Sequence, residues 1–155
     1  TLARSGKAIN LEQENIIVNA LRLNHTRIVH AMLSPQLIRF INMEQSPESL
    51  LAVLRDGGHT RYPVSRSKDV KDIFAYVVAK KVLPASNKEI ARMLENAKPI
   101  HTVDFRATLM AGLRTMLQNK EHLLAVVNSR NQCVGIVTLE DIVSELFNAD
   151  IEQFR

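Results

Sequence analysis

The sequence contains one cysteine, no tryptophan and only 5% aromatic residues. The single Cys133 excludes an internal disulfide and a zinc site built from several cysteines. So few aromatic rings make a poor stacking platform for nucleic acid bases. No run reaches the roughly 18 apolar residues of a membrane-spanning helix, and Thr1–Ser5 leads into polar sequence rather than a signal peptide. We therefore expect a soluble domain with a reduced thiol and no nucleic acid partner.

The residues that are present suit a globular domain. Of the 155 residues, 46% are hydrophobic and 23% are charged, close to the globular average. Lys and Arg number 20 against 16 Asp and Glu, which gives a formal net charge of +4. A domain of this size buries roughly 70% of the surface of its unfolded chain, enough for a core without cross-links. Since the sequence begins at Thr1 without methionine, we expect a fragment of a longer protein.

The first part of the chain predicts a helix followed by irregular extended structure. Ala8–Leu23 has apolar residues at helical spacing, and Asn10 with Gln13 forms a potential capping box. Two apolar-rich stretches follow on either side of a break at Ser34 and Pro35, and we expect both to be extended: Arg27–Leu33 and Leu37–Ile41.

The rest of the chain shows one order of elements twice. Ser46-Pro47-Glu48 begins a helix that Asp56-Gly57-Gly58 ends, and the strands Arg61–Val64 and Ile73–Val78 follow. The same order then returns as a strand, a helix, two strands and a closing helix: Ile100–Val103, Leu109–Leu117, Leu123–Val127, Cys133–Val137 and Leu139–Phe147.

Superposition of the two halves makes the repeat explicit. Leu50 corresponds to Leu109, and Ala75–Leu83 corresponds to Gly135–Val143. Arg61–Val64 falls on Leu124–Val127, with three more residues in the turn that follows the first of these strands. Each half has too little core to be stable alone. The fold class we expect is α/β (α+β), with two strand–helix–strand–strand–helix repeats packed with pseudo-twofold symmetry after an N-terminal helix.

A linking helix is predicted between the repeats. Ser86 and Glu89 form a capping box, and Pro99 ends the helical pattern of Ser86–Ala97. The expected organisation is an N-terminal linker helix (1–25), a first repeat (26–84), a linking helix (85–98), a second repeat (99–150) and a C-terminal tail (151–155).

The most informative stretch for chemistry is Gly135–Asp141. Thr138 lies where a strand ends and a helix begins, and a helix N-terminus favours an anion such as phosphate. The Thr138 hydroxyl adds a donor, and Asp141 can accept hydrogen bonds from the two vicinal hydroxyls of a ribose. Gly135 allows a ligand or a facing backbone to come close. Thr138 and Asp141 also fit a simple capping box, and the two interpretations are compatible.

Other candidates favour structural roles. None of the five histidines is spaced with a cysteine or an acid as metal ligands are, so we expect them to be solvated or hydrogen-bonded: His25, His30, His59, His101 and His122. We expect Cys133 to be a small buried residue, and three methionines (Met93, Met110 and Met116) to lie in apolar helix faces. The lysines at 68, 71, 80 and 81 predict solvated surface. Without a nucleophile–base pair, a metal cluster or a G-x-x-x-x-G-K loop, we expect no enzyme activity.

Several separated motifs resemble a known family. Gly135–Asp141 matches the G-h-h-T-x-x-D signature of CBS domains, and nearly the whole chain resembles a tandem CBS pair, or Bateman module. The finer pattern resembles the CBS pair of the CorC/CNNM-type, hemolysin-related membrane proteins. It comprises Gly6…Glu14…Leu21-x-Leu23, Met32-x-Ser34-Pro35, His59-x-Arg61-Tyr62-Pro63-Val64 and the continuation of the signature to Val143.

The resemblance implies a nucleotide-binding regulatory segment. In such pairs the signature Asp binds ribose and the signature Thr binds phosphate or ribose, so Asp141 and Thr138 are the expected anchors of an adenine nucleotide. Arg61 is a candidate phosphate partner. The other residues of the expected site are Ile136, Glu140, His122, Ser34, Pro35, Tyr62 and Pro63. The implied parent is a membrane protein of divalent-cation (Mg or Co) transport, with this segment on the cytoplasmic side of the inner or plasma membrane.

Departures from the family pattern refine these expectations. In the first repeat, Val78 and Lys81 replace the signature Thr and Asp, so we expect one nucleotide site instead of two. Gln36 stands where the family often has arginine, which favours AMP over ATP with Mg. The resemblance also implies a homodimer, with Leu50–Leu54 and Leu109–Leu117, or the C-terminal counterparts of these helices, at its interface. The alternative is a structural dimerisation module that binds no ligand.

Overall fold

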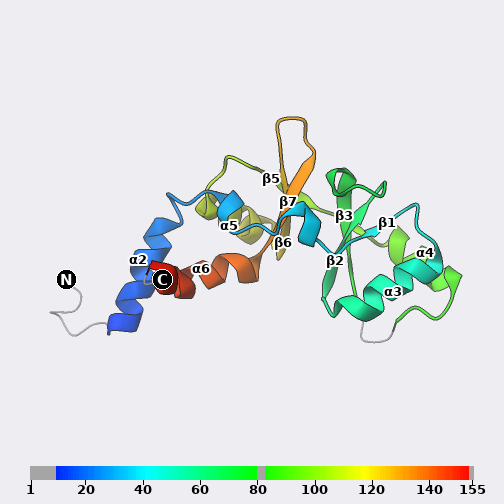
Figure 1. The fold of residues 1–155 in the computed structure, drawn as a ribbon, viewed down its shortest axis with the longest axis horizontal. Helices are drawn as coiled ribbons and strands as arrows, with labels where there is room; N and C mark the ends of the chain where they lie inside the picture. Colours follow the sequence, from blue (N-terminus) through cyan, green and yellow to red (C-terminus); the bar gives the residue numbers. More distant parts are fainter. Residues whose placement is uncertain (1–9, 80–82, 154–155) are drawn as a thin grey trace.

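In the computed structural model, which describes residues 10–79 and 83–153, two sheets lie side by side between two groups of helices. Figure 1 shows β1–β4 beside α3 and α4 at one end, and β5–β7 beside α2, α5 and α6 at the other. Between the sheets lies a cluster of buried residues from both halves, among them Tyr76, Leu123 and Ile136. This cluster is the seam that joins the halves, and it confirms the α+β fold with two packed repeats.

The first sheet has the order β1-β2-β3-β4. Its strands are β1 (Ile41–Asn42), β2 (Arg61–Ser65), β3 (Ile73–Val78) and β4 (Lys98–Pro99). The β1–β2 pair is parallel and the other two pairs are antiparallel. Two helices cover this sheet, α3 (Pro47–Gly57) and α4 (Asn87–Glu95), and they bury Leu50, Leu54 and Ile90 against it.

The second sheet repeats this arrangement with three strands in the order β5-β6-β7. They are β5 (His101–Asp104), β6 (Leu123–Val127) and β7 (Cys133–Thr138), again with a parallel pair followed by an antiparallel pair. Two helices pack here, α5 (Leu109–Asn119) and α6 (Leu139–Gln153), and they bury Leu109, Met116 and Ile142. The predicted order of strand, helix, two strands and helix is therefore confirmed in the second half. In the first half, the helix that follows β3 among the described residues is α4, which the sequence predicted as the linking helix.

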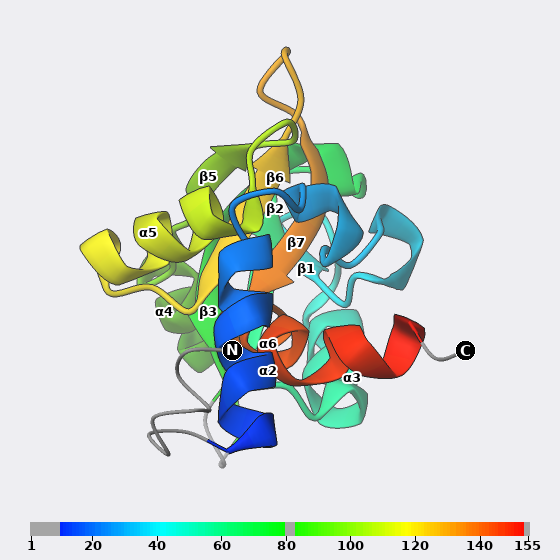
Figure 2. The ribbon, with the colours of Figure 1, turned by 90° about the vertical axis from the view of Figure 1, so that its left-hand side faces the viewer.

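The N-terminal helix α2 (Leu11–Arg22) packs on the second half. The predicted capping box is present, since Asn10 Oδ1 accepts from Gln13 N at 2.8 Å and Gln13 Oε1 accepts from Asn10 N at 2.9 Å. Figure 2 shows α2 crossing α6, and the buried Asn19 side chain donates to the Leu146 carbonyl at 2.8 Å. The predicted start of this helix at Ala8 lies outside the described residues.

The pairing registers correct one detail of the predicted repeat. The register shifts between Val64 and Ser65 opposite β3 and between Val126 and Val127 opposite β7, so Val64 corresponds to Val126 and not to Val127. The turn after β2 is consequently two residues longer than its counterpart, and not three. Both strands are buried along almost their whole length, so no alternation of apolar and polar residues indicated the register.

The prediction of extended structure over 27–41 is wrong in part. Short 3₁₀ turns occupy η1 (Ile28–His30) and η2 (Pro35–Leu37), and regular strand is limited to Ile41–Asn42. Ile28 is fully buried in the core of the second half, and its N–H donates to the Ala107 carbonyl at 2.8 Å. The segment crosses between the two halves, so local turns satisfy its backbone groups where no continuous strand partner exists.

Candidate functional site

The junction between β7 and α6, the β7–α6 corner, is built by two reciprocal hydrogen bonds. Thr138 N donates to Asp141 Oδ2 at 2.8 Å, and Asp141 N donates to Thr138 Oγ1 at 3.1 Å. The capping-box interpretation is therefore confirmed. It leaves two groups without a partner among the described residues, namely the hydroxyl proton of Thr138 and the second carboxylate oxygen of Asp141. Both side chains are partly exposed, so both groups are open to a ligand.

A segment from the first half lies directly against this corner. Leu33 N donates to the Ile136 carbonyl at 2.7 Å, and Ile136 N donates to the Leu33 carbonyl at 3.2 Å. This bridge places Ser34 and Pro35, the next two residues, beside the end of β7. The Ser34 side chain caps nothing in η2, so its hydroxyl is available.

Gly135 makes this close approach possible. A Cβ on Gly135 would overlap the sulfur of Met32 and lie 3.1 Å from the Leu33 carbonyl oxygen. A larger residue would force the Met32 side chain to move and would press on the Leu33 carbonyl oxygen. The space provided by the glycine is thus used by a facing backbone of the same chain, one of the two alternatives that the sequence left open.

Two further predicted residues join the same corner. Leu123 pairs with Thr138, and the carbonyl of the preceding His122 accepts from Leu139 N at 2.9 Å. The side chains of His122 and Glu140 are exposed beside the first turn of α6. The structure therefore brings together seven of the predicted site residues: Ser34, Pro35, His122, Ile136, Thr138, Glu140 and Asp141.

The other three predicted residues, Arg61, Tyr62 and Pro63, lie on β2. Tyr62 is fully buried in the core of the first half, and its phenol oxygen accepts from His59 N at 3.1 Å. Pro63 is also buried, and Arg61 is half-buried at the end of the strand. No hydrogen bond or ion pair between described residues joins these three to Thr138 or Asp141. The Tyr62 side chain is thus committed to the core.

A polar cluster that the sequence analysis missed crosses the seam. Tyr76 donates from its hydroxyl to Glu121 Oε2 at 2.7 Å, and His101 Nδ1 lies 3.7 Å from Glu121 Oε1. Burial, followed by the hydrogen bond to Glu121 and its negative charge, raises the pKa of Tyr76 to about 12, while the charge of Arg61 acts in the opposite direction. These residues are far apart in sequence, and no motif connects them.

Cys133 takes the structural role that was predicted. Cys133 is buried, its thiol donates to the Gly135 carbonyl at 3.2 Å, and burial raises its pKa. Within the described residues no group of three His, Cys, Asp or Glu side chains could hold a metal ion. None of the helices searched in that part of the chain is both long and apolar enough to span a bilayer.

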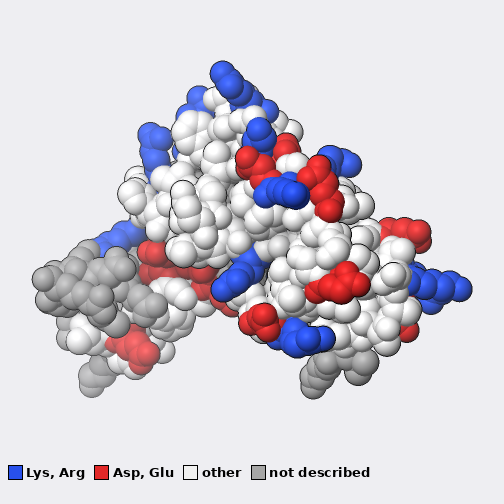
Figure 3. Space-filling model, turned by 45° about the vertical axis from the view of Figure 1, so that its right-hand side comes forward, with Lys and Arg blue, Asp and Glu red and all other residues white. Residues whose placement is uncertain are grey.

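The charged surface is mixed. Lys68 and Lys71 are exposed, as predicted, and on the face drawn in Figure 3 the basic side chains occur singly or in small groups. In the first half, Val78 is 45% exposed and supplies no hydroxyl where the second half has Thr138. The prediction for Lys80 and Lys81 lies outside the described residues.

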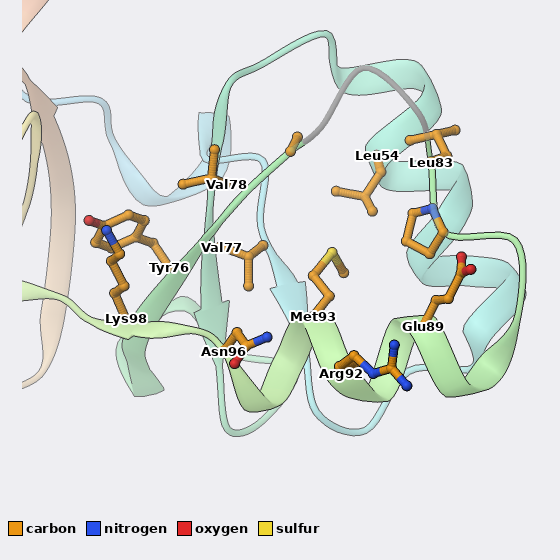
Figure 4. A pocket seen from close by; sticks show the side chains of 12 residues that line it. Leu54, Tyr76, Val77, Val78, Leu83, Glu89, Arg92, Met93, Asn96 and Lys98 are labelled. Carbon is orange, nitrogen blue, oxygen red and sulfur yellow. The ribbon is translucent and has the colours of Figure 1, made fainter.

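A cavity of about 550 Å³ lies in the first half, away from the β7–α6 corner. Leu54, Val77 and Met93 line its interior (Figure 4), and neither Thr138 nor Asp141 borders it. The sequence analysis did not predict this cavity. The β7–α6 corner is the candidate site because Thr138 and Asp141 have unused hydrogen-bonding groups there and because a segment from the first half lies against it.

Comparison with known proteins places this geometry in a family context. The CBS domain family matches residues 89–148. The chain is 25% identical over 146 residues to the magnesium and cobalt efflux protein CorC of Vibrio cholerae, a match that covers 93% of this chain and 50% of that protein. The chain thus spans about half the length of this curated relative.

Solved structures agree with the fold. The CBS domain of a bacterial CNNM/CorC family Mg²⁺ transporter has a TM-score of 0.80 and 26% identity, with 94% of this chain and 89% of that chain covered. A structure of such a domain in complex with ATP has a TM-score of 0.75 and 27% identity, with 86% of this chain and 96% of that chain covered.

Proposed function

Because the chain folds as a pair of CBS domains similar to those of the CNNM/CorC family of Mg²⁺ transporters, we propose that it binds one adenine nucleotide at the β7–α6 corner. The observation that carries this proposal is the reciprocal Thr138–Asp141 capping, which holds both side chains in place and leaves a hydroxyl proton and a carboxylate oxygen unused. The similar CBS domain in complex with ATP supports the ligand class.

Each residue of the corner has a specific role in this proposal. The free oxygen of Asp141 accepts from the ribose hydroxyls, and the Thr138 hydroxyl donates to a phosphate or ribose oxygen. The positive end of the α6 dipole favours the negative charge of the phosphate. Ser34 adds a second hydroxyl, and Pro35 offers apolar surface to the base. The Ile136 side chain is buried in the seam, and its backbone holds the crossing segment through the bonds to Leu33. His122 and Glu140 border the phosphate side. Of the three predicted residues on β2, Arg61 is the one whose side chain is not buried, and it remains the candidate phosphate partner, whereas Tyr62 and Pro63 are buried in the first half.

We propose AMP as the preferred nucleotide, with ATP and Mg as the alternative. A triphosphate needs more cationic partners than a monophosphate does, and Gln36 stands where the family often has arginine. Only Arg61 among the predicted site residues carries a permanent positive charge. This favours the ligand with the smaller negative charge.

The position of the corner suggests how binding regulates. Ser34 and Pro35 come from the segment that crosses from one half to the other, so a nucleotide would contact both halves at once. A ligand shifts the balance between two arrangements only by its difference in affinity for them. We propose that the nucleotide biases how this homodimeric module, paired through α3 and α5, controls an attached membrane protein of divalent-cation transport from the cytoplasmic side.

A structural dimerisation module without ligand is the second candidate. The observation that favours it is the same capping box, because Thr138 and Asp141 satisfy each other's backbone groups without any bound molecule. The two candidates differ in one measurable property, the stabilisation of the fold by adenine nucleotides.

Calorimetric titration with AMP, ADP and Mg-ATP tests the proposal. We expect saturable binding by the parent chain, and stabilisation by about 2.7 kcal/mol at a hundredfold excess over Kd. Thr138→Ala and Asp141→Ala should abolish or strongly weaken binding. Thr108→Ala is the matched control, because Thr108 caps α5 by the same bond to Ala111 N at 3.2 Å away from the corner. Equal binding by parent and Thr138→Ala would disprove the assigned site, and the absence of any thermal shift would favour the structural module.

A further inference from the structure

Tyr62 holds the loop that leads from α3 to Arg61. His59 N donates to the Tyr62 phenol oxygen at 3.1 Å, and the two rings meet edge to face with their centroids 5.7 Å apart. Tyr62 is fully buried. Gly57, the last residue of α3, makes room for the phenol, because a Cβ at this position would overlap the Tyr62 hydroxyl. One buried side chain thus fixes the segment between α3 and β2.

The counterpart of Tyr62 in the second half has no hydroxyl. Gly58 and Lys120 each end a helix in the left-handed region, with φ of 65° and 54°. Counted from these two residues, Tyr62 corresponds to Leu124, and both side chains are fully buried. Apolar packing at this position therefore does not require a hydroxyl, so the phenol oxygen serves another purpose than filling the core.

The two loops satisfy the same backbone group in different ways. In the second half, Glu121 N donates to the Met116 carbonyl of α5 at 2.8 Å, which is a main-chain bond. Its counterpart in the first half, His59 N, donates to the side chain of Tyr62. The course of the first loop therefore depends on the identity of one side chain, whereas that of the second does not.

Arg61 directly precedes Tyr62, and its side chain points away from the core that buries Tyr62, because successive side chains of a strand point to opposite faces. Burial raises the pKa of Tyr76 to about 12 and the charge of Arg61 acts in the opposite direction, so the guanidinium lies within electrostatic range of that hydroxyl in the seam. Tyr76 donates to Glu121, and the carbonyl of the next residue, His122, accepts from the first residue of α6. Within the described part of the chain no acceptor bonds the guanidinium, so its donors are available near the phosphate side of the β7–α6 corner.

We propose that Tyr62 is a positioning residue for the phosphate of the bound nucleotide, because its hydroxyl fixes the loop that carries Arg61. This inference rests on the nucleotide site proposed above and adds to it a residue that does not touch the ligand. The guanidinium of Arg61 recognises the phosphate, and Tyr62 acts only through the backbone. Loss of the Tyr62 hydroxyl should therefore weaken the phosphate contact and leave the contacts of the nucleoside unchanged.

Calorimetric titration of Tyr62→Phe and of the parent chain with AMP and with adenosine tests the proposal. The variant keeps the buried ring and removes only the acceptor of the His59 N–H. We expect its affinity for AMP to fall by about threefold, in line with the contribution of one hydrogen bond, while its affinity for adenosine stays unchanged. Unchanged adenosine binding also shows that the variant is folded.

Arg61→Gln completes a double-mutant cycle. It should lower the affinity for AMP by about tenfold, because a hydrogen bond to a charged group is lost, and should leave adenosine binding unchanged. In this background Tyr62→Phe should have no further effect on AMP, since the group that it positions is gone.

Ser46→Ala is the matched control, because Ser46 Oγ accepts from Ser49 N at 3.2 Å at the other end of α3. This variant also loses a bond from a side chain to the backbone, and it should bind both ligands like the parent. The proposal is overturned if Tyr62→Phe binds AMP like the parent, if it loses affinity for AMP and adenosine equally, or if its effect on AMP persists in the Arg61→Gln background. AMP binding that Arg61→Gln leaves unchanged overturns it as well, whereas a parent chain that binds no AMP overturns the nucleotide site itself.

Discussion

Tyr76 on β3 and Glu121 just before β6 are joined by a 2.7 Å hydrogen bond that crosses the seam between the two halves. Tyr76 is only 3% exposed, and it belongs to the buried cluster that both sheets share. The bond thus ties the repeats together through a polar contact inside an otherwise apolar seam. Two predictions depend on it.

Tyr76→Phe should lower the free energy of unfolding by about 1.5 kcal/mol, because a hydrogen bond to a charged carboxylate is lost while the ring still packs. Urea denaturation of parent and variant measures the difference. Glu121→Gln in the Tyr76→Phe background is the informative second step. If the loss of the Tyr76–Glu121 hydrogen bond causes the destabilisation, Glu121→Gln should lower the free energy of unfolding less in the Tyr76→Phe background than in the parent. Equal costs in both backgrounds would mean that the two side chains do not interact.

The stability of the fold should also fall at high pH. The pKa of Tyr76 is raised to about 12 in the folded state, above its value of 10 in the unfolded chain. The stabilisation is therefore complete below pH 10 and is lost as the pH rises through 12, since the unfolded state then binds fewer protons. Ultraviolet titration of the two tyrosines should show a phase near pH 12 that is absent in Tyr76→Phe. A parent titration identical to that of the variant would contradict the assignment.

Gly135→Ala should destabilise the chain by about 2 kcal/mol, a typical cost of overpacking, and should also weaken nucleotide binding. The added methyl group would overlap the Met32 side chain and press on the Leu33 carbonyl oxygen, which directly precedes Ser34. Gly58→Ala is the control, because Gly58 has a φ of +65° but open space around it. That variant should lose stability through backbone strain and keep its nucleotide affinity.

A rescue experiment sharpens this prediction. Met32→Ala removes the side chain that a Cβ on Gly135 would overlap, and should restore part of the stability that Gly135→Ala loses. The Leu33 carbonyl oxygen, 3.1 Å from the added atom, prevents a full recovery. If Met32→Ala and Gly135→Ala were simply additive, the overlap would not be the cause of the loss.

Cys133 should react slowly with a thiol reagent in the native chain at neutral pH. The side chain is 3% exposed, and burial raises the pKa of its thiol, so little reactive thiolate is accessible. Labelling with Ellman's reagent in increasing urea should accelerate across the same transition that denaturation follows. Rapid labelling without urea would contradict the buried position.

The sequence predicted most elements because their local signals are strong. Ser46 and Pro47 begin α3, Gly58 ends it, and Ser86 caps α4, as each pattern indicates. The Thr138–Asp141 capping box also forms as the spacing of the two residues indicates. The failures occur where local signals conflict with packing. Leu37 suggested a strand, yet it lies in a 3₁₀ turn and is 64% exposed.

By itself, the order of residues determined that the chain consists of two similar halves and that only the second has a threonine and an aspartate at the signature positions, where the first has Val78 and Lys81. Both facts follow from the spacing of residues along the chain, because the 3.6-residue period of a helix fixes which side chains lie on the same face. The tertiary structure decided which distant segments meet: Leu33 with Ile136, Tyr76 with Glu121, and α3 with α4 around a cavity. Such contacts depend on how whole sheets and helices pack. The packing of one half against the other cannot be read from the spacing of residues along either half.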